Sequence, residues 1–80
     1  MANIKPTKYQ RVRDLREDKD LSQKTLAAYL GISQGTYSQY ETDTLGISLE
    51  TMGKLADFHG TSVDFLMGRT DVQTPYPKQF

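Results

Sequence analysis

Hydrophobic residues recur at helical spacing in two short segments near the middle of the chain, residues 23–30 and 34–41. Residues three and four positions apart share one face of a helix, so each segment has a single apolar face. The apolar positions are Leu26, Ala27 and Leu30 in the first segment and Tyr37 and Tyr40 in the second. Gly31 stands between the segments, where a sharp reversal of the chain needs a positive φ angle. The pattern predicts two helices joined by a tight turn.

A serine stands directly before each of these two predicted helices. Ser22 and Ser33 can each accept a hydrogen bond from a free backbone N–H of the first helical turn. Each serine follows an apolar residue whose partner for a hydrophobic staple comes five positions later. The staple pairs are Leu21 with Leu26 and Ile32 with Tyr37. Capping and packing together specify both helix starts.

A further helix is predicted before this pair. Thr7 and Gln10 have the spacing of a capping box, so this helix should begin near Lys8. Asp20 should end it in the left-handed conformation, which aspartate tolerates better than most residues. The expected inward positions are Val12 and Leu15, with Tyr9 beside them.

Two more helices are predicted after the central pair. Ser48 caps the first of them and Gly60 ends it, while Ser62 and Gly68 bound the second. Gly53 is a poor helix former, which indicates a close contact with another helix. The expected inward positions are Leu49, Met52, Leu55, Ala56 and His59 in the first helix, and Val63, Phe65 and Leu66 in the second.

These elements predict an all-α fold, a compact bundle of five helices that contains a helix-turn-helix. Residues 1–6 are expected to form a flexible N-terminal arm, residues 7–68 the helical domain, and residues 69–80 an irregular tail. A chain of 80 residues has room for one small domain with a limited core.

The composition narrows the class of protein further. The chain has no cysteine, no apolar run long enough to span a membrane and no signal peptide, so a soluble, cytoplasmic protein is expected. A single histidine, His59, makes an ordinary zinc site implausible, and its place at a helix end favours a structural role. No phosphate-binding loop, nucleophile elbow or paired carboxylate motif is present. We therefore expect neither an enzyme nor a bound cofactor or metal.

The charge balance argues against strong non-specific binding to nucleic acid. Ten basic residues balance ten acidic ones, although seven of the basic residues precede Thr25. The N-terminal part should therefore be locally positive, while the neutral total predicts weak attraction to phosphates in general.

The second central helix has an outward face that is polar and uncharged. Its members are Gln34, Gly35, Ser38 and Gln39. A glutamine can pair with the N6/N7 edge of adenine in a DNA major groove, and a serine can contact several bases. The alternative is an ordinary solvated helix face, which this pattern taken alone favours.

Several segments at fixed offsets resemble the helix-turn-helix of the Cro/C1-type (XRE) transcriptional regulators. They are Leu21-Ser22-Gln23, Leu26-Ala27, Leu30-Gly31-Ile32-Ser33-Gln34 and Tyr37-Ser38-Gln39-Tyr40-Glu41. The likeness extends from about Val12 to Gly68, which is most of the chain.

The resemblance implies a lambda repressor-like fold and sequence-specific binding of double-stranded DNA in transcriptional regulation, as a repressor. A homodimer on a pseudo-palindromic operator is implied, with half-sites about 34–36 Å apart. It also implies a structural ion pair between Arg16 and Glu41. The implied base contacts are Gln34, Gly35, Ser38 and Gln39, and the implied phosphate contacts are Gln23, Ser33, Thr36 and Thr44. We place the dimer contact on the last helix and the tail, at Phe65, Tyr76 and Phe80.

The chain departs from the family at two places. Gly35 stands where relatives often carry a side chain that contacts a base, so it either removes one contact or permits close approach of the backbone. The segment 42–47 offers no positive charge, where relatives commonly have basic residues. Both departures favour the alternative hypothesis, a protein-interaction module, antitoxin-like or a co-regulator, with weak or no DNA binding.

Overall fold

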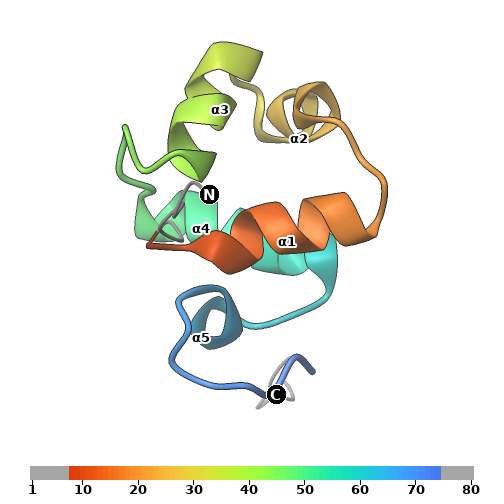
Figure 1. Cartoon of the computed structure of the whole chain (residues 1–80), viewed down its shortest axis with the longest axis vertical. Helices are drawn as coiled ribbons and strands as arrows, with labels where there is room; N and C mark the ends of the chain where they lie inside the picture. Colours follow the sequence, from red (N-terminus) through yellow and green to blue (C-terminus); the bar gives the residue numbers. More distant parts are fainter. Residues whose placement is uncertain (1–7, 75–80) are drawn as a thin grey trace, which may run out of the picture.

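A computed structural model of the chain describes residues 8–74, and each regular element in that range is an α-helix (Figure 1). The helices are α1 (Gln10–Asp18), α2 (Gln23–Leu30), α3 (Gln34–Glu41), α4 (Leu49–His59) and α5 (Val63–Leu66). The predicted all-α fold with five helices is confirmed within these residues. The predicted arm, residues 1–6, lies outside the described residues, as does the last part of the predicted tail, residues 75–80.

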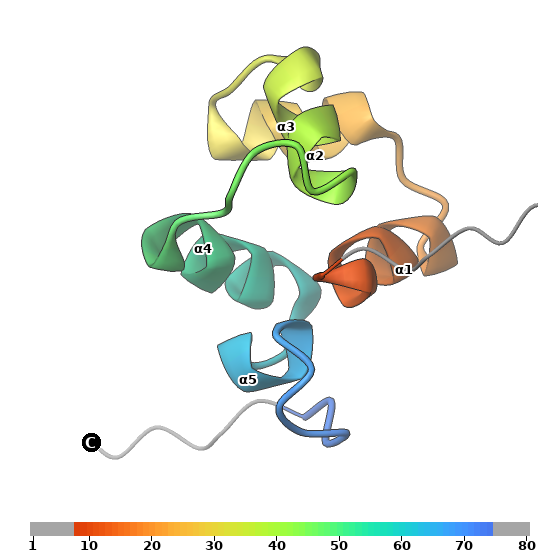
Figure 2. The same cartoon turned by 60° about the vertical axis from the view of Figure 1, so that its left-hand side comes forward.

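The helices are arranged along the long axis of the molecule (Figures 1 and 2). Helices α2 and α3 form one end, α1 and α4 the middle, and α5 with the segment that follows it the opposite end. The buried core draws on every helix: Val12, Leu15, Leu26, Ala27, Tyr37, Met52, Leu55, Ala56 and Leu66. None of the helices in the described part of the chain has the length and apolar character that a membrane span requires.

The α2–turn–α3 unit forms through local interactions that the sequence already indicates. The hydroxyl of Ser22 accepts the backbone N–H of Thr25 at 3.1 Å, and that of Ser33 accepts the backbone N–H of Thr36 at the same distance. Gly31 between them has φ 71°. The predicted bounds of both helices are therefore confirmed.

Helix α1 begins at Gln10, two residues later than predicted. Its N-cap is Tyr9, whose side chain makes no capping hydrogen bond, and the predicted cap Thr7 lies outside the described residues. The backbone N–H of Lys8 instead donates to the Asp43 carboxylate at 2.9 Å. A side chain distant in sequence therefore supplies the acceptor at this helix start. Asp20 has the predicted left-handed backbone, with φ 59°.

Helix α4 corrects two predictions. Leu49 was expected to face inward but is 74% exposed, because it is the first residue of the helix and lies beyond the edge of the core that begins at Met52. Gly53 was expected to mark a close helix contact, yet a methyl group built on it meets nothing within 4 Å.

Gly53→Ala should therefore raise the free energy of unfolding by up to about 1 kcal/mol, because alanine has the higher helix propensity and the added methyl meets no obstacle. Urea denaturation followed by far-UV circular dichroism measures the change. Gly31→Ala is the opposed control, since its φ of 71° strains any side chain and stability should fall. A loss of stability in Gly53→Ala would reveal a packing contact that the structure does not contain.

Candidate nucleic-acid interface

The outward face of α3 carries two glutamine side chains that have no hydrogen-bond partner within residues 8–74. Gln34 and Gln39 are both exposed, and neither side-chain amide makes a hydrogen bond among the described residues. Ser38 lies between them and is half-buried, and its hydroxyl makes no such bond there either. This face therefore offers amide and hydroxyl groups whose hydrogen-bonding capacity remains available to a ligand.

Gly35 lies on the same face, and nothing there forbids a side chain. A Cβ built on it would meet only the Ser33 hydroxyl oxygen, at 3.9 Å. The backbone of α3 is thus uncovered at this position, and another molecule can approach it closely.

The start of α3 presents a second polar group. The Ser33 hydroxyl donates to Thr36 Oγ1 at 2.9 Å while its oxygen accepts the Thr36 backbone N–H. The Thr36 hydroxyl proton is therefore left available for an external acceptor. A helix N-terminus also favours anions through its free N–H groups and its dipole.

Thr44 is less well prepared for such a contact. Its hydroxyl lies 2.9 Å from that of Thr42, which donates to the carbonyl of Ser38 at 3.1 Å. Because Thr42 uses its one proton on that carbonyl, Thr44 must donate to Thr42. A phosphate contact from the Thr44 hydroxyl would require this bond to break.

Glu41, at the end of α3, joins three helices. Arg16 of α1 donates to its carboxylate through Nε at 2.7 Å and Nη2 at 3.0 Å, and Gln23 of α2 donates through Nε2 at 3.1 Å. A further Arg16 nitrogen donates to the carbonyl of Leu21 at 2.8 Å. Since Glu41 is only 2% exposed, these contacts hold α3 at a defined orientation against α1 and α2.

The protonation states follow from this arrangement. Burial alone would raise the pKa of Glu41, but the polar groups of Arg16, Tyr37 and Gln23 around the carboxylate outweigh burial and the pKa is lowered. Hydrogen bonding to Glu41 raises the pKa of Arg16. Burial and the nearby Glu41 charge raise the pKa of Tyr37, whose buried hydroxyl makes no hydrogen bond of normal geometry. Arg16 and Glu41 are thus both charged at neutral pH.

The Gln23 contact differs from the role that the resemblance implies for it. Besides a phosphate contact, the family resemblance implies that Gln23 supports Gln34 across the turn, but among the described residues no hydrogen bond joins the two side chains. Its amide is directed to Glu41, where the ionised carboxylate is the stronger acceptor.

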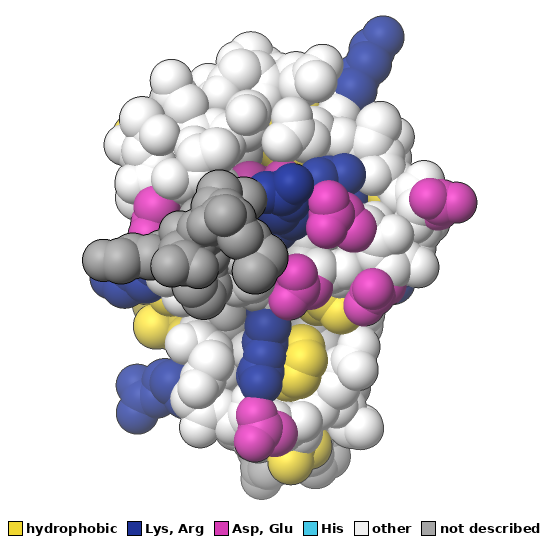
Figure 3. All heavy atoms as spheres, in the orientation of Figure 1, with side chains coloured by type: hydrophobic (Ala, Val, Ile, Leu, Met, Phe, Trp, Pro, Cys, Tyr) yellow, Lys and Arg dark blue, Asp and Glu magenta, His cyan; other side chains and the backbone are white. Residues whose placement is uncertain are grey.

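The surface around α3 is almost free of charge. From Thr25 to Thr42 the only charged residue is Glu41, which is buried. In Figure 3 charged side chains gather over the middle of the molecule and are sparse over α2 and α3. Lys24 of α2 is exposed.

The expected positive N-terminal surface is partly neutralised in the folded protein. Arg11, Arg13 and Arg16 each form an ion pair with a carboxylate: Asp71, Glu17 and Glu41 respectively. Arg11 also donates to the carbonyls of Phe65 and Thr70 and lies 4.1 Å from the centre of the Phe65 ring. It thus connects α1 to α5 and the segment after it, a contact that no local sequence signal indicates.

Lys19 and His59 form another contact that sequence patterns do not reveal. Lys19 Nζ lies 3.2 Å from His59 Nδ1 and 3.4 Å from its carbonyl oxygen. Burial, and secondarily the Lys19 charge, lower the pKa of His59 to about 4. His59 is therefore neutral at neutral pH, and Lys19 supplies the positive charge at the C-terminal end of α4. No group of three or more potential metal ligands occurs within residues 8–74.

Comparison with known proteins adds independent evidence. A family model described as Helix-turn-helix matches residues 12–66. The transcriptional repressor RstR of the cryptic phage CTXphi in Vibrio cholerae is 38% identical over 61 residues, which cover 76% of this chain and 55% of RstR. The HTH-type transcriptional regulator AnsR of Bacillus subtilis (strain 168) is 37% identical over 68 residues, covering 85% of this chain and 59% of AnsR.

An SPbeta prophage-derived uncharacterized HTH-type regulator of the same strain, YonR, is 36% identical over 64 residues, covering 80% of this chain and 59% of YonR. The chain thus spans only a little over half the length of the curated relatives it matches. No solved structure matches it significantly. The match across most of the chain, together with the α2–turn–α3 geometry, shows that the protein belongs to the Cro/C1-type helix-turn-helix family of transcriptional regulators.

Proposed function

We propose that this protein binds double-stranded DNA sequence-specifically and represses transcription, with α3 in the major groove. The observation that carries the proposal is the pair of exposed amides on α3, Gln34 and Gln39, which have no hydrogen-bond partner among the described residues. In the groove these amides and the Ser38 hydroxyl would meet base edges, and uncovered Gly35 would let the α3 backbone approach them.

Phosphate contacts would fix the register of α3 on the duplex. The available hydroxyl proton of Thr36 and the N-terminus of α3 suit one phosphate, with Ser33 beside them. Gln23, at the first position of α2, can donate its second side-chain amide proton to a phosphate while the first is donated to Glu41, and the free backbone N–H groups at the start of α2 lie beside it. Thr44 would contribute only after giving up its bond to Thr42.

The proposal also includes repression of transcription and binding as a homodimer. The similar protein RstR is a transcriptional repressor by name. One short helix reads few base pairs, so a homodimer on a pseudo-palindromic operator, with half-sites about 34–36 Å apart, would supply the remaining affinity.

Selection of bound fragments from a random duplex pool tests the proposal and supplies the operator. Gln34→Ala should then lower the preference for the selected site over scrambled duplex by roughly 1–3 kcal/mol, because it removes a bidentate base contact. Fluorescence anisotropy with both duplexes measures the preference. Gln73→Ala is the matched control, since Gln73 is also exposed but lies in the segment after α5, at the opposite end of the molecule (Figure 1). Equal preference in Gln34→Ala and wild type would rule out Gln34 as a base contact.

The uncharged surface around α3 favours a second candidate function, a protein-interaction module of the antitoxin or co-regulator type. Exposed residues between Thr25 and Thr42 carry no charge that could neutralise a phosphate. Salt dependence separates the two functions. A DNA-binding protein loses duplex affinity steeply as salt rises, whereas an interaction module shows no saturable duplex binding even at low salt.

A further inference from the structure

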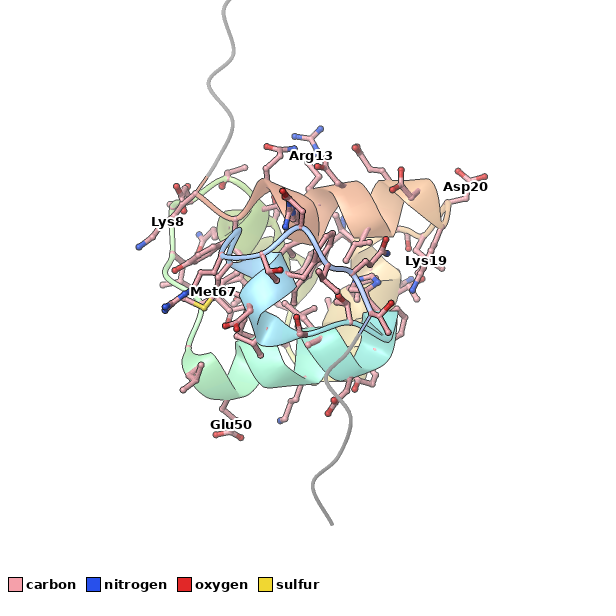
Figure 4. All side chains as sticks on the ribbon, turned by 90° about the horizontal axis from the view of Figure 1, so that it is seen from below. Lys8, Arg13, Lys19, Asp20, Glu50 and Met67 are labelled. Carbon is pink, nitrogen blue, oxygen red and sulfur yellow. The ribbon has the colours of Figure 1, made fainter. Side chains whose placement is uncertain are left out.

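The loop after α3 contains an aspartate held in a strained and specific position. Asp43 has φ 66°, a left-handed backbone that few residues other than glycine adopt. Its Oδ2 accepts the backbone N–H of Lys8 at 2.9 Å. Lys8 stands at the start of α1, and Figure 4 shows it at the opposite end of that helix from Lys19 and Asp20. The hydrogen bond to Lys8 therefore gives the carboxylate a defined place.

That place is directly beside the end of α3. The backbone N–H groups of Thr44 and Leu45 donate to the carbonyl of Gln39 at 3.0 and 3.1 Å, which folds the loop back onto the last turn of the helix. In the chain, Asp43 comes directly before Thr44 and two residues after Glu41. It therefore adjoins the last turn of α3, which carries the exposed Gln39. The loop and the outward face of α3 form one continuous part of the chain.

The negative charge of Asp43 is not compensated there. Among residues 8–74 it forms no ion pair, and the Lys8 ammonium lies over the Tyr9 ring instead, 5.3 Å from its centre. From Thr25 to Leu49 the only charged residues are Glu41 and Asp43, and Glu41 is buried against Arg16. The exposed surface of α3 and its following loop therefore has a net negative charge.

We propose that the Asp43 carboxylate sets the affinity of this protein for DNA by repelling phosphates, and that it does so equally at every sequence. The inference rests on the proposed function, because it requires α3 and its loop to face a duplex. A charge that acts on the phosphate backbone changes affinity uniformly across sequences and leaves the preference for one site unaltered. Recognition then depends on base contacts, and weak general binding keeps the protein free of non-cognate DNA.

The substitution Asp43→Asn removes the negative charge of this side chain and keeps its shape. Asparagine adopts the left-handed conformation readily, and its side-chain oxygen can still accept the Lys8 N–H. At about 50 mM salt this variant should bind both the selected and a scrambled duplex about two- to five-fold more tightly than wild type. The gain should shrink as salt rises, and the ratio between the two duplexes should stay constant. Fluorescence anisotropy across a salt series measures all three quantities.

Asp57→Asn is the matched control, because Asp57 is an exposed aspartate on α4 and the substitution changes net charge by the same amount. Little or no gain in Asp57→Asn supports the proposal, whereas an equal gain would assign the effect to net charge and overturn it. No gain in Asp43→Asn, or a changed ratio between duplexes, would also overturn it while leaving the proposed function intact. Absence of saturable binding by wild type and Asp43→Asn to every duplex at low salt would refute both.

Discussion

Arg16→Ala should lower the free energy of unfolding by about 3–5 kcal/mol, the typical cost of removing one partner from a buried ion pair. Glu41 is only 2% exposed, and of the side-chain hydrogen bonds that its carboxylate accepts within the described part of the chain, only the one from Gln23 would remain. Small domains have a total stability of about 5–15 kcal/mol, so a large part of the stability of this protein depends on one guanidinium. Urea denaturation followed by far-UV circular dichroism measures the loss.

Arg13→Ala provides the matched control for this prediction. Arg13 is also an arginine of α1 with a glutamate partner, Glu17, but both side chains are about half exposed, at 49% and 50%. Its loss should cost less than about 1 kcal/mol because solvent screens the pair. The double variant Arg16→Met, Glu41→Leu should recover much of the stability, since no buried charge is left without a partner. Equal losses in Arg16→Ala and Arg13→Ala would show that burial does not strengthen the Arg16–Glu41 pair.

Acidification should destabilise the protein mainly through His59. The pKa of this buried imidazole is about 4 in the folded protein and near 6.5 when the chain is unfolded. The unfolded state therefore binds more protons between these values, and the stability contributed by neutral His59 is fully present above pH 6.5 and is lost as the pH falls toward 4. The difference corresponds to about 3 kcal/mol.

His59→Leu should flatten this part of the pH profile. Lys19 faces the imidazole at 3.2 Å. Glu41, whose pKa is lowered, loses its own contribution only below about 4.5, in both proteins. The window from about pH 6.5 to 4.5 thus isolates His59. Urea denaturation at several pH values measures it, and a wild-type profile as flat as that of His59→Leu would contradict the low pKa.

Local patterns specify the helices of this protein because the interactions that create them are local. The Ser22 and Ser33 caps, the Gly31 turn and the apolar spacing involve residues within a few positions of one another, and α2 and α3 have the predicted bounds. The first helix shows the limit of such inference. It begins at Gln10, later than the local capping motif predicts, and the backbone N–H of Lys8 just before it donates to Asp43, 35 positions away.

The Arg16–Glu41 contact spans 25 positions, and only the resemblance to a family implied it, since no periodicity connects the two residues. The side-chain amides of Gln34 and Gln39 on α3 could be predicted only in part. Helical spacing indicates that they point outward, but whether they have hydrogen-bond partners inside the protein depends on packing.

Sequence alone was sufficient for the helical fold, for the turn between α2 and α3, and for the polar face of α3, because helix periodicity and capping act over single turns. Local sequence patterns could not predict which charged side chains are paired in the folded protein. Folding pairs Arg11 with Asp71 and places Lys19 against His59, while Asp43 is left beside α3 without an ion pair in the described chain. Electrostatic interactions depend on distances across the whole fold, so only the assembled structure determines which charges remain for a ligand.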